Sequence, residues 1–253
     1  MIYINHLKLT ESSGICRSPT IPGLYYSHND SGNAPTLYAF DELGENLGEY
    51  PLNLRPLDCE AISSGMVNSV PTIILCDVGD NNLARLSYKI HVINEVSGTS
   101  GPTFSRSINF TYPDGKRRNC ESATLLPDGK IILVTKSYPL ASGPTQAFTL
   151  LSYLSGDSGT VCFAGPLLHA KLGTITDADY KDGVLVLLGV IKTRPAAHFF
   201  NVGDWTPFKS VVLDTAPQAE ALCLSHDGKK VLMTSETNRT AGARTPLYVK
   251  PLL

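Results

Sequence analysis

Acidic residues followed at once by small and apolar residues recur along this chain. The clearest example is "DCEAIS", in which Asp58 and Glu60 are two residues apart and lead into an apolar segment. Carboxylates that enter an apolar environment are costly unless a cation, a proton or hydrogen bonds neutralise them. The same sequence pattern surrounds four further acids, so the matched set is Glu11, Glu60, Glu121, Asp179 and Glu220.

Five matched carboxylates that converge on one point would favour a metal site. Crowded carboxylates cannot all stay ionised alone, so either some are protonated or a cation binds. Oxygen ligands on a rigid frame suit Ca²⁺, which takes about six to eight of them, although another divalent cation is an alternative. Cys59 and Cys120 are expected to point away, because neighbouring side chains on a strand face opposite sides, and zinc is therefore disfavoured. The alternative interpretation is that the acids cap loops or pair with strand amides.

The spacing of these acids indicates a repeated unit. Successive members of the set are 41 to 61 residues apart, and a period of about 40–50 residues is typical of propeller blades. Patterns typical of helices are scarce, and 17 prolines and 21 glycines interrupt the chain. Short apolar or alternating runs bounded by turn residues dominate, which predicts an all-β protein.

Each unit is expected to contain up to four strands, the first of which begins at the acid. Second strands are predicted at 23–28, 72–77, 130–136, 183–189 and 229–236. Third strands are predicted at 36–41, 86–93, 147–154, 197–202 and 246–253, and fourth strands at 46–53, 103–110, 160–168 and 208–214. Turn sequences such as "PDGK" and "HDGK" lie between first and second strands, as tight hairpins require.

The strand count predicts how the ring closes. The fifth unit has three strands, and one strand, residues 2–9, precedes the first acid. If this N-terminal strand completes the last unit, no open sheet edge remains. We therefore expect residues 1–253 to form a single five-bladed β-propeller closed by the N-terminal strand. A six-bladed ring is the alternative, because two of the units have room for extra strands.

In such a propeller the first strands line a central channel, and the five acids are expected to meet at one mouth of it. The loops after the second strands would form the rim of that mouth. They carry cations that could grip a phosphorylated ligand together with a metal. We assign catalytic roles to Arg85, Lys136 and His28, the last as a general base. Substrate-binding roles are assigned to Asp30, Asp80, Arg194, Arg239 and Arg244. The alternative is that these charges are an ordinary solvated surface.

Several of these sequence motifs resemble those of a known family. "ESSGI", "HNDSG", "DCEAI", "CDVGDNNLAR" and "CESATLLPDGKIILVTKS" resemble, in the same order over roughly residues 9–137, bacterial propeller proteins with ESSGLA, THNDSG, DWEDIA, VGDIGDN and DAEALL motifs. The chain is similar more loosely to SdiA-regulated propellers, to phytase-like esterase domains and to calcium-activated nucleotidases, which are five-bladed propellers with channel glutamates around Ca²⁺. The resemblance implies the fold. No catalytic residue is transferred, and the family's tryptophan in DWEDI is replaced here by Cys59.

Composition limits the partners. The formal net charge is −2, which favours no nucleic-acid partner. The longest apolar run, residues 183–190, is far shorter than the roughly 20 residues that span a bilayer, so no membrane partner is expected. The first residues lack a signal-peptide pattern. The six cysteines form no CxxC pair and are expected to be buried, reduced thiols of a cytoplasmic protein.

Three functions fit these observations. The first is a Ca²⁺-dependent hydrolase that acts on a phosphorylated small molecule, a phosphoester or a phosphoanhydride, at the channel mouth. The second is an esterase or lactonase in which the metal polarises a carbonyl group. The third is a non-enzymatic module that binds a ligand or a protein and uses the metal for structure. Neither the substrate nor the oligomeric state is specified by the sequence.

Overall fold

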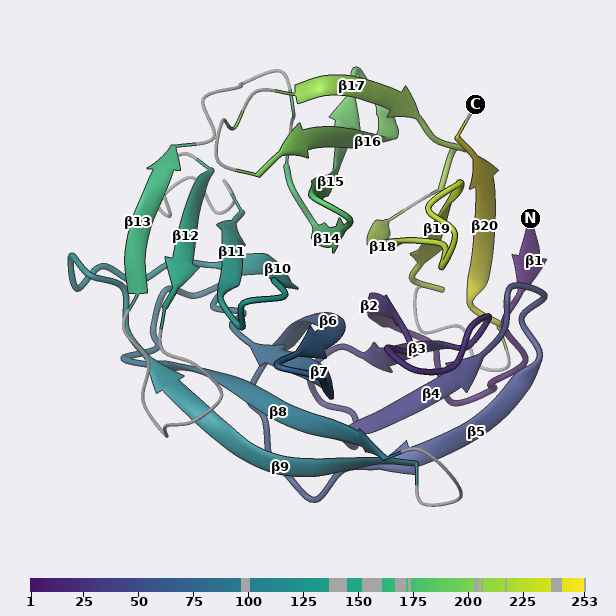
Figure 1. Ribbon diagram of the computed structural model, residues 1–253, viewed down its shortest axis with the longest axis horizontal. Coiled ribbons are helices and arrows are strands. Elements are labelled where there is room, and N and C mark those ends of the chain that lie inside the picture. The colour runs from purple at the N-terminus through teal and green to yellow at the C-terminus, as the bar shows by residue number, and fades with distance from the viewer. Residues whose placement is uncertain are drawn as a thin grey trace.

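The computed structural model is a ring of five four-stranded antiparallel sheets around a central axis (Figure 1). It describes residues 1–96, 101–136, 145–151, 161–166, 172, 174–202, 205, 207–216, 218–237 and 243–252. The sheets have the strand orders β2-β3-β4-β5, β6-β7-β8-β9, β10-β11-β12-β13, β14-β15-β16-β17 and β18-β19-β20-β1. The prediction of a five-bladed propeller is therefore confirmed.

The strands follow the predicted order with bounds that differ by a few residues. The inner strands are β2 (Ser12–Arg17), β6 (Cys59–Val67), β10 (Cys120–Leu125), β14 (Asp177–Lys181) and β18 (Ala219–Leu224). The second strands are β3 (Tyr25–Asn29), β7 (Val70–Asp77), β11 (Ile131–Thr135), β15 (Val184–Ile191) and β19 (Lys230–Ser235). The third strands are β4 (Thr36–Phe40), β8 (Tyr88–Val96), β12 (Gln146–Leu150), β16 (Arg194–Asn201) and β20 (Pro246–Pro251). The outer strands are β5 (Asn46–Pro51), β9 (Gly101–Phe110), β13 (Val161–Pro166), β17 (Pro207–Val212) and β1 (Ile2–Tyr3).

The N-terminal strand closes the ring as predicted, but it is shorter than expected. Strand β1 pairs antiparallel with β20, with Ile2 opposite Leu247 and Tyr3 opposite Pro246. The predicted strand continued to residue 9. After Tyr3 the chain instead crosses from the outside of the last blade to the inner strand of the first one. Ile4 and Leu9 are completely buried on this path, so the segment also contributes to the core.

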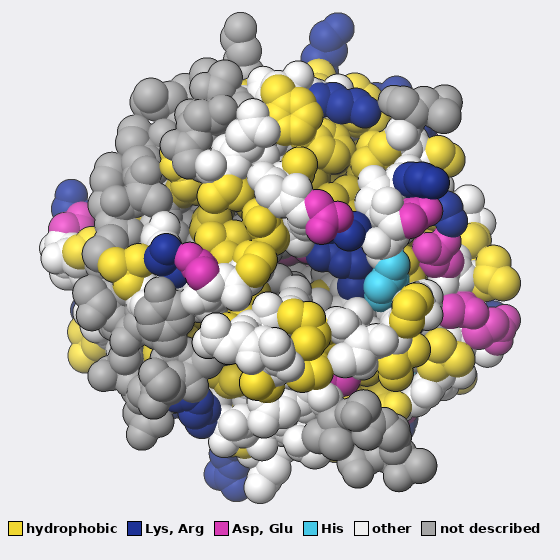
Figure 2. All heavy atoms as spheres, viewed as in Figure 1, with side chains coloured by type: hydrophobic (Ala, Val, Ile, Leu, Met, Phe, Trp, Pro, Cys, Tyr) yellow, Lys and Arg dark blue, Asp and Glu magenta, His cyan; other side chains and the backbone are white. Residues whose placement is uncertain are grey.

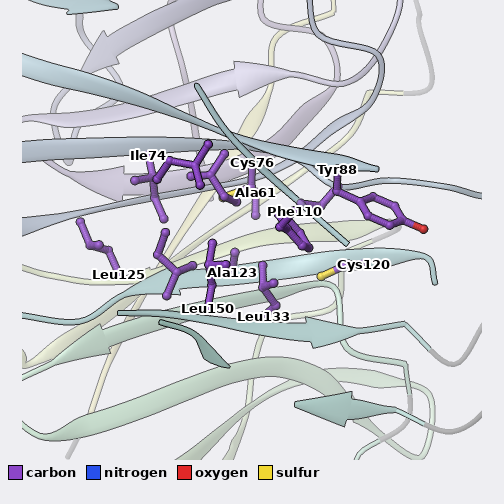
Figure 3. Packing of buried hydrophobic residues seen from close by; sticks show 14 of the residues in the cluster. Ala61, Ile74, Cys76, Tyr88, Phe110, Cys120, Ala123, Leu125, Leu133 and Leu150 are labelled. Atoms are coloured by element: carbon purple, nitrogen blue, oxygen red, sulfur yellow. The ribbon is translucent and has the colours of Figure 1, made fainter. Parts of the chain in front are cut away.

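The hydrophobic core is divided among the boundaries between blades. The buried apolar residues form five clusters in the described part of the chain, and each cluster joins two neighbouring blades. Figure 3 shows the cluster between the second and third blades, in which Ala61 and Ile74 lie opposite Ala123 and Leu150. Each blade packs against a neighbour on both sides, so its strands bury apolar side chains on both faces. This explains why many strands are nearly continuous apolar runs.

Two smaller expectations have partial outcomes. Cys16, Cys59, Cys76, Cys120 and Cys223 are free and buried, as expected, whereas the side chain of Cys162 lies outside the described residues. Where the chain is described, it has no helix that could cross a membrane.

The inner strands share an irregularity that shapes the channel. The pairing register shifts at the start of β2, β6, β10 and β18, so that one extra residue stands out from each ladder. The extra residues are Ser13, Glu60, Glu121 and Glu220. A β-bulge redirects a side chain, and here it does so at the same level of four blades.

Candidate metal centre at the channel mouth

A repeated backbone hydrogen bond builds the mouth that precedes the inner strands. In each case an N–H group just after a second strand donates to the carbonyl oxygen two residues before a bulge. The pairs are Asp30 with Glu11 (2.9 Å), Gly79 with Asp58 (3.1 Å), Lys136 with Asn119 (3.0 Å) and Glu236 with Gln218 (3.2 Å). Asp30, Gly79, Lys136 and Glu236 therefore occupy equivalent positions of four blades, and we call these the rim positions.

Three carboxylates meet at this mouth. Asp30, Asp58 and Glu60 each offer one oxygen, and these oxygens lie within 4.8 Å of one another. Glu60 is 6% exposed, and its one side-chain hydrogen bond within the described chain is a long one, 3.4 Å from Ser13 Oγ. Three oxygens at this separation, one of them on the buried Glu60, fit the oxygen-rich shell of a hard divalent cation.

Gly79 leaves the space that this group occupies. A Cβ atom built on Gly79 would lie 2.7 Å from Glu60 Oε1 and would also overlap the Asp58 carboxylate. Such contacts are shorter than real Cβ atoms make, so any larger residue at this rim position would displace the two acids. The glycine thus permits a close approach of backbone and carboxylates, as glycines near ligands often do.

The electrostatics of the three acids favour a positive charge between them. Burial raises the pKa of Asp58 to about 6, and the neighbouring Asp30 carboxylate adds to this rise. Burial, with Glu121 and Asp30, also raises the pKa of Glu60 well above its ordinary value. The pKa of Asp30 rises for the same reasons, since it is partly buried and lies near Glu11. A cation would offset both the burial and the repulsion that raise these three pKa values.

Glu121 and Glu220 lie on another side of the same mouth, with Lys136. The Lys136 ammonium is 3.0 Å from Glu121 Oε2, while Asn119 Nδ2 donates to Glu121 Oε1 at 2.8 Å. Lys136 also interacts with Glu220 and Glu60. Glu60, Glu121 and Glu220 therefore all lie close enough to interact with Lys136, while their role as metal ligands stays a prediction.

Glu11 is at the mouth, but not at the level of the other glutamates. The bulge places Ser13 beside Glu60 in the ring, and Glu11 matches Asp58 instead. Glu11 Oε2 accepts a hydrogen bond from Asn33 Nδ2 at 2.9 Å. Sequence reasoning did not include Asp58 among the metal ligands, and aligning "ESSGIC" with "DCEAIS" residue by residue would have revealed it.

Asp179 does not belong to this mouth, and the prediction that all five acids meet there is wrong. Its carboxylate accepts hydrogen bonds from the Arg17 guanidinium, with Nη2 and Oδ1 3.1 Å apart, and from the N–H of Leu224 at 2.8 Å. Arg17 and Leu224 are the last residues of their inner strands, so Asp179 lies toward the opposite end of the channel. The reason is that β14 has no bulge, and its acids occupy deeper positions.

Arg85 and Asp80 are structural, contrary to the roles assigned to them. The Arg85 guanidinium forms an ion pair with Asp77 (2.8 Å), donates to the carbonyl of Gly79 (2.9 Å) and covers the Tyr88 ring. Asp80 accepts from the N–H groups of Ala84 (2.7 Å) and Arg85 (3.1 Å) and from the Tyr88 hydroxyl (3.1 Å). These contacts shape the loop that carries Gly79 and engage both terminal nitrogens of the Arg85 guanidinium, whereas Arg85 Nε is buried without a hydrogen-bond partner among the described residues.

Of the other predicted site residues, His28 borders the same small cavity as Asp30, whereas Arg194 lies beside an outer strand and Arg244 in a loop. His28 is 2% exposed, its Nε2 lies against Gly14, and burial lowers its pKa to about 4, which does not support a general base. Arg194 donates to the carbonyl of Leu213 (2.9 Å), beside an outer strand. Arg244 is exposed in the loop before β20. Arg239 lies outside the described residues.

The opposite mouth has a cavity of about 270 Å³ whose lining includes Arg17, Tyr180, Lys181 and His226. Figure 2 shows a hollow near the centre of one face of the ring with Lys or Arg and His side chains at its edge. The polar groups here already have partners, since Lys181 pairs with Asp182 and His226 Nε2 lies 3.1 Å from the carbonyl of Ser18. This end of the channel therefore offers a ligand less unsatisfied charge than the acidic mouth does.

Comparison with known proteins supports the propeller class. No protein-family model and no curated protein matches the chain. The solved structures that it resembles include a glutaminyl cyclase from Myxococcus xanthus, with 11% identity, a TM-score of 0.57 and coverage of 100% of this chain and 96% of that one. A GH43 endo-arabinanase from Bacillus licheniformis has 8% identity, a TM-score of 0.57 and coverage of 98% and 96%. A putative oxidoreductase from Thermus thermophilus has 12% identity, a TM-score of 0.53 and coverage of 95% and 97%. At these identities the likeness concerns the fold alone.

Proposed function

We propose that this propeller binds one divalent cation at the acidic mouth of its channel and uses it to hydrolyse an anionic small molecule. The observation that carries the proposal is the convergence of Asp30, Asp58 and Glu60, whose oxygens lie within 4.8 Å of one another. The space left by Gly79 and the burial of Glu60 support it. Ca²⁺ is the ion that the all-oxygen donor set suits best, because it accepts about six to eight oxygen ligands.

The three acids would fill part of such a shell and leave positions for water and a ligand. A bound cation would polarise a phosphoryl or carbonyl oxygen and lower the pKa of a bound water molecule. Lys136 would hold a negatively charged group of the ligand, because its ammonium lies at the same mouth and interacts with Glu60. The acids themselves would bind the cation and fix its position.

The substrate that we propose is a phosphorylated small molecule, either a phosphoester or a phosphoanhydride. Lys136 supports this class, since a cation beside a metal can stabilise a transferring phosphoryl group. An esterase or lactonase would use the same cation on a carbonyl oxygen. Because Arg85 is engaged with Asp77, the proposed grip on phosphate depends on fewer groups than the sequence suggested.

A second candidate function is a binding module in which the cation is structural. The use of Arg85 and Asp80 to shape the loop favours it, because these residues were expected to contact the substrate. In that case the cation would join the first two blades, since Asp30 follows β3 and Asp58 precedes β6. The two functions differ in whether the bound cation keeps a position open for a ligand.

Calorimetric titration with Ca²⁺ tests the cation site, and a substrate screen tests the reaction. We expect the wild type to bind one ion and Glu60→Gln to bind it much more weakly. Asp179→Asn is the matched control, because it removes a channel carboxylate at the opposite end, and its binding should equal that of the wild type. Turnover of nucleotides, sugar phosphates or simple esters with Ca²⁺, but not with chelator, would support the hydrolase. Ion binding without any turnover would support the binding module, and no ion binding would exclude both.

A further inference from the structure

Lys136 stands where glutamates from three blades converge. Its ammonium is 3.0 Å from Glu121 Oε2 and is 18% exposed. Burial alone would lower the pKa of Lys136, but Glu121, Glu220 and Glu60 together raise it above its ordinary value. The charged form of this lysine is therefore stabilised by acids from the second, third and fifth blades.

The backbone fixes Lys136 at this point. Its N–H donates to the carbonyl oxygen of Asn119 at 3.0 Å, the hydrogen bond that defines a rim position. The other rim positions carry Asp30, Gly79 and Glu236, so Lys136 is the one rim residue among these four that has a positive charge. The amide of Asn119 holds the second oxygen of Glu121 at 2.8 Å. Both oxygens of Glu121 are thus engaged, whereas Glu60 accepts one long hydrogen bond, 3.4 Å from Ser13 Oγ, among the described residues.

We propose that Lys136 is a built-in cation that limits this mouth to a single divalent ion. It neutralises the side formed by Glu121 and Glu220 and leaves Asp30, Asp58 and Glu60 as the one group that requires an external cation. The proposal deepens the proposed function, on which it rests for the ion at those three acids. It follows that removal of the lysine charge leaves Glu121 and Glu220 free to bind a second divalent ion.

Ion stoichiometry tests this inference. Lys136→Met keeps most of the side-chain length and removes the charge, so equilibrium dialysis with Ca²⁺ should find two bound ions per chain against one for the wild type. Lys136→Arg keeps the charge and should bind one. Lys130→Met is the matched control, because Lys130 belongs to the same blade and pairs with Asp128 at the turn before β11. It should also bind one ion.

The ion counts separate this inference from the proposed function. One ion bound by Lys136→Met would overturn the inference and leave the proposed site intact. No ion bound by the wild type would refute the proposed function and, with it, the single-ion limit that the inference states, whether or not Lys136→Met binds an ion. If Lys136→Met does not fold, Lys136→Gln replaces it. Failure of both variants to fold even in Ca²⁺ would overturn the inference, because a bound ion would then be unable to replace the charge of the Lys136 ammonium.

Discussion

The Cα atom of Gly79 faces the carboxylate of Glu60 so closely that a Cβ atom on Gly79 would lie 2.7 Å from Glu60 Oε1. We predict that Gly79→Ala weakens Ca²⁺ binding by about 10–100-fold, the cost commonly found when groups around metal ligands are altered. The backbone tolerates alanine here, because Gly79 is not among the residues with positive φ. Calorimetric titration measures the effect.

Gly65→Ala provides the control for that substitution. Gly65 lies in β6, the strand that also carries Glu60, and its Cβ atom would have its nearest neighbour at 4.0 Å. This variant should bind Ca²⁺ as the wild type does. If Gly79→Ala does so as well, the acids do not form the cation site in the arrangement described.

We expect Arg85→Ala to destabilise the protein rather than only to impair a ligand site. Although burial raises the pKa of Asp77, the nearby His91 ring, whose Nε2 is 3.8 Å from Oδ2, a hydrogen bond from the Asp58 N–H and the Arg85 charge hold it at about 2. Without Arg85 a fully buried carboxylate loses its ion pair, which typically costs about 3–5 kcal/mol. Urea unfolding should show this loss, whereas Arg244→Ala, at an exposed position, should change stability by less than about 0.5 kcal/mol. An unchanged urea midpoint for Arg85→Ala would show that Arg85 does not stabilise the fold and would favour the catalytic role predicted for it.

The fold could be predicted because each strand and turn carries a local signal. Apolar runs bounded by turns such as "PDGK" define the hairpins, and the position of residues 2–9 follows from the missing strand of the last blade. The bulges carry no such signal. Glu11 and Glu60 belong to similar words, yet only the register of β2 shows that Ser13 takes the place of Glu60.

The candidate site could be predicted in part for a related reason. Glu60, Glu121 and Glu220 repeat the same strand start, so their convergence follows from the repeat. In β14 the bulge is missing, and Asp179 therefore pairs with Arg17 although its local sequence looks equivalent. Arg85 pairs with Asp77 because the loop after β7 turns back, and the local sequence does not predict this turn.

Closure of the ring leads to a prediction about the N-terminal segment. Leu9 is completely buried and packs in the cluster that joins the last blade to the first, with Ile15 and Leu247. Leu9→Ala should lower the free energy of unfolding by about 2–5 kcal/mol, because it removes buried methyl groups and leaves a cavity. Leu7→Ala is the control, since Leu7 is 62% exposed and should lose little. Equal unfolding midpoints for the two variants would show that residues 4–9 do not help to close the ring.

The pKa of Glu220 predicts how stability depends on pH in the absence of a cation. Burial raises this pKa to about 7, and the charges of Glu121, Glu236 and Asp30 add to the rise while Lys136 opposes it. The folded protein therefore holds a proton on Glu220 that the unfolded chain releases near its ordinary value of 4.5. The stabilisation that the protonated Glu220 contributes is complete below pH 4.5 and is lost as the pH rises through about 7. At about 1.4 kcal/mol per pKa unit, the loss amounts to roughly 3 kcal/mol.

Urea unfolding in the presence of chelator, at several values from pH 4.5 to pH 7.5, measures this loss. Glu220→Gln should remove the share of the decline that Glu220 causes, because glutamine does not titrate, whereas Asp58 and Glu60, whose pKa values are also raised, keep theirs. Glu45→Gln, at an exposed position, should leave the decline unchanged. Asp77 contributes an opposite dependence, since its lowered pKa costs stability as the pH falls below about 4, and the chosen range avoids that effect. A decline of the same size in Glu220→Gln would assign the titration to another group at the mouth. A saturating concentration of Ca²⁺ should reduce the decline in the wild type, because a cation stabilises the ionised carboxylates around it.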